Sequence, residues 1–146
     1  MTMPIDPENP VAKLCAAGME VEGDSAAASA LFAQAWEARR DDYDAAIAAH
    51  FVARHQPTPE ETLRWNALAL EHGLRVGDDR LAELLPSLYL NVADSQRLVG
   101  NDAEASRVVA LASAAVEGLP AGGYRDFVSF GIERLKDRLS GAARLP

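Results

Sequence analysis

The stretch from Tyr89 to Ala112, YLNVADSQRLVGNDAEASRVVALA, decides the fold because it contains a complete helix–turn–helix pattern. A first apolar segment has the small residue Ala93 at its middle and ends at Gly100, which favours a turn. The second segment has a small–large–small triplet at helical spacing, made by Ala105, Val109 and Ala112. Such small residues let two antiparallel helices approach closely, while the larger one fills the gap beside the next pair.

The same pattern occurs twice earlier in the chain. The matching triplets are Ala28, Phe32 and Ala35 and, 34 residues later, Thr62, Asn66 and Ala69. The preceding small or polar residue and turn residue are Ala16 with Gly23 and His50 with Pro57. Self-similarity at such a period is the signature of a helical repeat, here over about residues 9–42, 43–76 and 86–118.

Capping residues and apolar spacing predict seven helices. The first four are expected to begin at Asn9, at Asp24 or Ser25, at Asp41-Asp42 and at Thr58. The expected ranges of the seven are about 10–22, 24–40, 41–55, 58 to either 73 or 77, 78–99, 103–117 and 124–139. Pro86 falls inside the fifth range and leaves two alternatives, a kinked helix or one that begins at Pro86. Residues 140–146 are expected to be frayed.

These repeats resemble the tetratricopeptide repeat, a family built from stacked helix pairs. Residues 47–56, 63–66 and 86–91 are also similar to small bacterial tetratricopeptide-like proteins of unassigned role. The resemblance covers about residues 9–118, with some nine extra residues between the second and third units. The second unit departs from the family pattern, because His50 and Asn66 stand where a small and an aromatic residue are usual.

We therefore predict one all-α domain over residues 1–146, a short α-solenoid of three tetratricopeptide-like helix pairs with a C-terminal capping helix. A solenoid needs a terminal element to cover the apolar face of its last pair. The helix at about 124–139 suits this role, with Tyr124, Phe127, Val128 and Leu135 expected to cover the pair before it.

Composition excludes several classes of function. Asp and Glu outnumber Lys and Arg by 22 to 14, so the formal net charge is -8 and nucleic acid is not an expected partner. No stretch reaches the roughly 18 apolar residues of a membrane span, and no signal-peptide pattern occurs at the start. Cys15 is the single cysteine, which rules out an internal disulfide. We expect a cytoplasmic protein that uses no cofactor and no metal.

The resemblance implies that the first helices of successive pairs line a concave groove. Helical spacing predicts that six residues face it: Phe51, Arg54, His55, Asn91, Asp94 and Arg97. Arg54 and Arg97 occupy equivalent repeat positions and would lie side by side, where they could bind a carboxylate. The alternative is a solvated network of these arginines with Asp44 and Asp94.

A second possible site is a pocket formed by His50, Trp65, Asn66 and Tyr89. We expect His50 to face Thr62 and Asn66, either as part of a satisfied buried polar cluster or as a general base. His50 and His55 diverge by about 140° on a helix, so they do not form a zinc site.

The leading functional hypothesis is a non-enzymatic adaptor or regulator that binds a protein segment in the groove. The alternative is a protein that binds or sequesters a small organic molecule in the pocket near His50, and a small enzyme using His50 is a third reading. Self-association is also open, since a short solenoid has partly covered ends.

Overall fold

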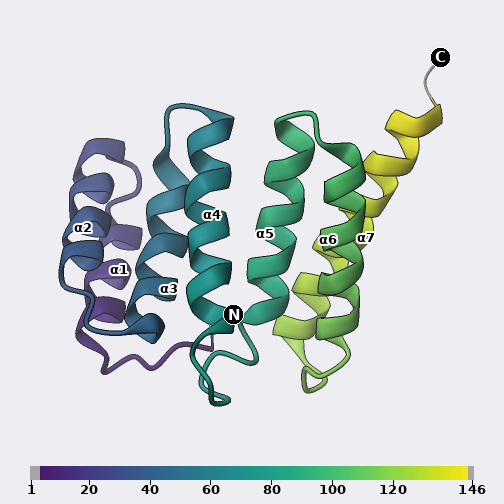
Figure 1. Ribbon diagram of the computed structural model, residues 1–146. Coiled ribbons are helices and arrows are strands. Elements are labelled where there is room, and N and C mark those ends of the chain that lie inside the picture. The colour runs from purple at the N-terminus through teal and green to yellow at the C-terminus, as the bar shows by residue number, and fades with distance from the viewer. Residues whose placement is uncertain (1–3, 145–146) are drawn as a thin grey trace.

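Seven α-helices make up most of residues 4–144, the part of the chain that this computed structural model describes (Figure 1). They are α1 (Pro10–Glu20), α2 (Ser25–Glu37), α3 (Asp42–Val52), α4 (Pro59–Leu74), α5 (Leu85–Leu98), α6 (Asp102–Val116) and α7 (Gly123–Arg144). A short 3-10 turn, η1 (Ala53–His55), follows α3. No strand occurs within this range, so the all-α prediction with a C-terminal helix is confirmed.

Polar side chains begin four of the helices where the sequence predicts them. Asn9 accepts hydrogen bonds from the amides of the first turn of α1, and Thr58 accepts one from Glu61 N at the start of α4. Asp24 and Asp41 cap α2 and α3 in the same way. Each cap satisfies an amide that has no partner within the helix, which stabilises the end by about 1 kcal/mol.

Pro86 lies in the first turn of α5, so the alternative of a helix that begins there is confirmed over the kinked helix. Proline is tolerated at this position because its missing N–H would have no helical partner. The preceding turn buries Leu81 and Leu84. At the other end of the chain, α7 continues to Arg144, so the expectation of fraying is wrong for residues 140–144, where alanines favour helix. Residues 145–146 lie outside the described part.

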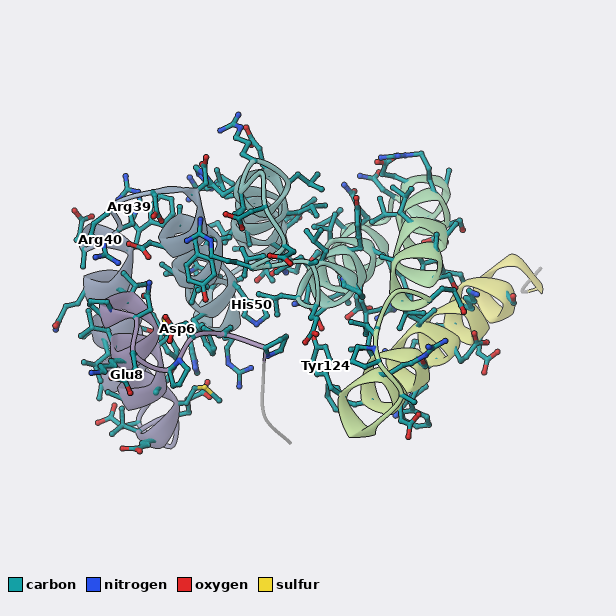
Figure 2. The ribbon with its side chains drawn as sticks, turned by 90° about the horizontal axis from the view of Figure 1, so that it is seen from below. Asp6, Glu8, Arg39, Arg40, His50 and Tyr124 are labelled. Atoms are coloured by element: carbon teal, nitrogen blue, oxygen red, sulfur yellow. The ribbon has the colours of Figure 1, made fainter. Side chains whose placement is uncertain are left out.

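The helices form an open row in which each packs mainly on its neighbours in the sequence (Figure 1). Two further contacts skip a helix: α1 packs on α3, and α5 packs on α7. These contacts place α1 beside α3 and α5 beside α7. In Figure 2 the row is bent, with α1 and α7 projecting from its two ends.

Repeat positions supply much of the two apolar cores. Ala28, Ala35, Ala69, Ala93, Ala105 and Ala112 are completely buried. One core joins α1–α4 and the turn before α5, and the other joins α5–α7. The first unit differs from its predicted register, because Ala16 is exposed and Gly18 instead lies against the buried ring of Phe32.

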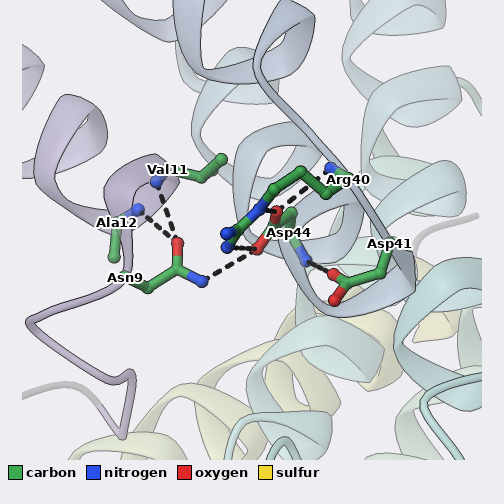
Figure 3. Close-up of polar contacts among 6 residues, drawn as sticks. All are labelled: Asn9, Val11, Ala12, Arg40, Asp41 and Asp44. Carbon is green, nitrogen blue, oxygen red and sulfur yellow. Dashed lines mark hydrogen bonds and ion pairs between the residues drawn. The ribbon is translucent and has the colours of Figure 1, made fainter.

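A buried carboxylate connects the first two hairpins (Figure 3). The side chain of Asp44 is completely buried and accepts hydrogen bonds from Arg40 Nε at 2.8 Å and from Asn9 Nδ2 at 2.8 Å. Burial by itself raises the pKa of Asp44, but the bonds from Arg40 and Asn9 outweigh it and lower that pKa. Asp44 therefore lies in the core and not on the groove stripe where helical spacing had placed it.

Candidate protein-binding groove

A polar contact in the middle of the row joins α3 to α5. His50 on α3 has its Nδ1 atom 3.3 Å from Asn91 Nδ2 on α5, and Figure 2 shows His50 between these two helices. The amide can donate only to the unprotonated nitrogen of a neutral imidazole. Burial, together with the positive charge of Arg54, lowers the pKa of His50 to about 4. His50 is thus a neutral packing residue at physiological pH.

An apolar hollow of about 230 Å³ lies between α1 and α3. Its walls come from both helices and from the N-terminal segment, and comprise Ile5, Pro7, Ala12, Ala16, Met19, Ile47 and Phe51. The segment is held in place because Asp6 N donates to Tyr43 Oη at 2.9 Å. Phe51, one of the six predicted groove residues, contributes to this hollow although its ring is only 3% exposed.

Arg54 and His55 do not face the middle of the row but bind Glu22 in the α1–α2 turn. Arg54 donates two hydrogen bonds to the Glu22 carboxylate, each 2.9 Å long, and His55 Nε2 lies 2.7 Å from Glu22 Oε2. The bond from Arg54 is the main cause that lowers the pKa of Glu22. The cluster attaches the first hairpin to the end of α3.

Ser25, His55 and the Glu22 carboxylate form a hydrogen-bonded series in this cluster, in which Ser25 Oγ lies 3.1 Å from His55 Nδ1. Two features oppose a catalytic role. Arg54 holds both oxygens of Glu22, which weakens the carboxylate's support of an imidazolium, and the Asp24 carboxylate, which accepts from Ala27 N, adds negative charge at the start of α2 beside Ser25 in the sequence. We assign the cluster to packing of the hairpins.

The other three predicted groove residues lie together on α5. Arg97 donates two hydrogen bonds to Asp94 Oδ1, at 2.9 and 3.1 Å, and Asn91 lies one turn before Asp94. Arg54 and Arg97 thus have separate carboxylate partners, as does Arg40 with Asp44. The structure therefore divides the six residues into two groups of three, and no ion pair among the residues described joins the charges of one group to those of the other.

A groove of about 340 Å³ separates α5 from α7, and we call it the α5–α7 groove. Residues of both helices line it: Leu90, Asn91 and Asp94 on α5, and Phe127, Phe130, Gly131, Arg134, Leu135 and Arg138 on α7. Phe127 is 62% exposed and Phe130 is 63% exposed. Two solvent-exposed phenylalanines on neighbouring turns are a costly arrangement for a surface without a partner.

The position of Phe127 corrects the sequence analysis, which placed this residue in the face that covers α6. Val128, Ile132 and Leu135 cover it instead and are almost completely buried. The signal was present in the sequence, because Phe127, Phe130 and Arg134 form a second stripe at three- and four-residue spacing. Of these three residues only Phe127 belonged to the predicted covering face, and Phe130 and Arg134 were not assigned to any face, so the groove-facing side of α7 was not predicted.

The proposed pocket residues are held in four different environments. Asn66 Nδ2 donates to Ser95 Oγ of α5 at 2.8 Å, whereas the hydrogen-bond contact of His50 is with Asn91. Trp65 packs edge-on against Trp36 with ring centroids 5.0 Å apart. Tyr89 packs against the second apolar core. Among the described residues no buried side-chain polar atom lacks a hydrogen-bond partner.

Searches of the described residues found no group of three metal-ligating side chains and no helix with the length and apolarity to cross a membrane. Comparisons of the chain with protein-family models, with curated proteins and with solved structures found no match. The class of protein is therefore given by the fold alone, an all-α chain whose hairpins end in a C-terminal helix.

Proposed function

We propose that the protein is a non-enzymatic interaction module, a tetratricopeptide-like adaptor or regulator that binds a protein segment in the α5–α7 groove. The observation that carries this proposal is the exposure of Phe127 and Phe130 beside the polar side chains of Asn91 and Asp94. Exposed aromatic residues next to polar groups are typical of the centre of a protein interface.

The open shape of the groove favours a chain segment over a small organic molecule. Pockets for small molecules bury most of the ligand, whereas Phe127 and Phe130 leave well over half of their surface in contact with solvent. A peptide can cover such a surface lengthwise and gain affinity from several shallow contacts. Two of the six residues predicted for the adaptor's binding face, Asn91 and Asp94, line this groove, and the C-terminal helix α7 supplies the other wall.

Selection from a phage library of random twelve-residue peptides tests the proposal. The protein is immobilised, and enriched peptides are synthesised and measured by fluorescence anisotropy. We expect affinities near ~10 μM, in the usual range of weak peptide recognition. The double variant Phe127→Ser with Phe130→Ser should weaken binding at least tenfold, because the apolar contacts of both rings are lost.

Leu111→Ser is the matched control, because Leu111 is also exposed but lies on α6 outside the groove. This variant should bind the selected peptides as the unmodified protein does. The proposal would be rejected if the library gave no peptides that depend on the two phenylalanines, or if Leu111→Ser weakened binding equally.

A further inference from the structure

We propose that the segment bound in the α5–α7 groove is acidic: its carboxylates pair with Arg134 and Arg138, and an apolar side chain contacts Phe127 and Phe130. This inference rests on the proposed function of the groove and adds the chemistry of the partner. The observation behind it is the charge balance of the groove, which differs from that of the chain as a whole.

Arg134 and Arg138 are exposed, and neither forms an ion pair with another residue whose side chain is described. Most other arginines do have a carboxylate partner, namely Arg40, Arg54, Arg75, Arg80, Arg97, Arg107 and Arg125. Arg39 and Arg64 also have no ion pair with a described side chain, but they lie over tryptophan rings, whereas Arg134 and Arg138 are one turn apart on α7 and line the groove. Arginine is well suited to bind carboxylates because its planar fork matches both oxygens.

The acidic residues nearby do not neutralise the groove. Among the described residues, Asp94 is the one acidic residue that lines it, and Arg97 donates two hydrogen bonds to its Oδ1 atom, which offsets that negative charge. Asp126, Glu133 and Asp137 are also on α7, but they do not line the groove. The lining therefore has a local excess of positive charge, and a segment with carboxylates would complement it.

The order of side chains along α7 sets the layout of the segment. Phe127 and Phe130 come first, and Arg134 and Arg138 follow on the same face, with the Arg134 guanidinium carbon 5.7 Å from the centre of the Phe130 ring. The distance along the helix from Phe127 to Arg138 is about 16 Å, which five residues of extended chain can span. We infer that the bound segment has an apolar residue and, about five residues before or after it, one or two carboxylates.

Single-stranded nucleic acid also binds surfaces that combine aromatic rings with arginines. The charge of the remaining chain argues against it, because a long polyanion would meet the repulsion of a protein with net charge -8. A short acidic segment is affected mainly by charges within about 8 Å at physiological salt, so the two arginines that line the groove act on it more strongly than the distant acidic residues of the chain do.

Reversing the charge of the two arginines tests the acidic character of the partner independently of whether the groove binds a segment at all. The same peptide library is selected on the unmodified protein and on Arg134→Glu with Arg138→Glu. Arg64→Glu serves as the matched control, since Arg64 is exposed on α4 and lies outside the groove. Circular dichroism of each variant checks that the helices are retained.

We expect peptides enriched in Asp and Glu on the unmodified protein and peptides enriched in Lys and Arg on the reversed protein. A synthetic acidic peptide should bind the reversed protein at least twentyfold more weakly, bind Arg64→Glu normally, and lose about fivefold in affinity between 50 and 500 mM NaCl.

Peptides that need Phe127 and Phe130 but show no excess of acidic residues would overturn the acidic partner and leave the groove function intact. A library without any phenylalanine-dependent peptides would overturn both. A twenty-nucleotide oligothymidine is included as a competitor, and its displacement of the peptide at equal or lower concentration would assign the groove to nucleic acid and overturn the inference.

Discussion

Gly131 on α7 lies so close to Leu90 on α5 that an added β-carbon would be 2.8 Å from Leu90 Cδ2. The absence of a side chain at position 131 thus lets the two helices meet at the base of the α5–α7 groove. Gly18 has the corresponding role in the first hairpin, where an added β-carbon would be 2.8 Å from Phe32 Cδ1. The two contacts differ in how far the neighbouring side chain can move.

Alanine at these two positions should have unequal effects on stability. Phe32 is only 1% exposed, so Gly18→Ala overpacks the core, and we expect a loss of about 2 kcal/mol after the better helix propensity of alanine is included. In Gly131→Ala the tip of half-buried Leu90 can rotate away, and the net change should stay within about 1 kcal/mol. Urea unfolding measures the free energy of unfolding of the two variants, and equal losses in that free energy would contradict this account.

The stability of the protein should fall as the pH drops from about 6.5 to about 4. The pKa of His50 is lowered from an ordinary value near 6.5 to about 4 in the folded protein, mainly by burial. Between these values the unfolded chain binds a proton that folded His50 does not, so stability rises with pH. The full effect would be about 3 kcal/mol.

His50→Gln is the variant that isolates this effect, because glutamine is polar and does not titrate. Urea unfolding at pH 7 and at pH 4.5 should show a smaller difference for the variant than for the unmodified protein. An unchanged difference would mean that other groups cause the pH dependence. The lowered pKa of Asp44 acts in a separate window, since its stabilisation is lost only below the ordinary aspartate value of about 4.

Two aspartate–arginine pairs should differ sharply in their contribution to stability. Asp44→Asn removes a completely buried carboxylate that Arg40 and Asn9 contact, and we expect a loss of about 3 kcal/mol. Asp94→Asn breaks a pair in which the Asp94 side chain is 41% exposed, so the loss should be under 1 kcal/mol. Thermal unfolding at pH 7 compares the two variants. Similar melting temperatures would show that the buried Asp44 carboxylate stabilises the fold no more than the exposed pair does.

Cys15 should report on unfolding, because its thiol is protected in the native protein. Burial raises the pKa of Cys15 to about 12, and the side chain is 1% exposed. A chromogenic disulfide reagent at pH 8 should therefore react slowly in buffer, since the thiolate is the reactive form, and rapidly in urea. Rapid reaction without urea would instead indicate that α1 opens locally.

Helix positions were largely predictable because they depend on local features of the chain. Asn9, Asp24 and Thr58 begin their helices as capping chemistry predicts. Pro86 lies in the first turn of its helix, which is one of the two alternatives expected for it. Which face of a helix is buried was less predictable. Helical spacing separates Phe127 from the stripe of Val128, Ile132 and Leu135, but it does not say which of the two stripes is buried, because burial depends on where α5 and α6 lie.

Side-chain partners between helices were set by the tertiary structure alone. The sequence by itself determined the all-α class, the helix pairs and the close-packing positions such as Ala93 and Ala105, since periodicity and small residues act through neighbours three and four positions away. Only the packing of separate helices decided that Arg54 binds Glu22, that His50 meets Asn91, and that α7 opens a groove against α5. These contacts depend on the angle and distance between helices, which no local pattern of residues encodes.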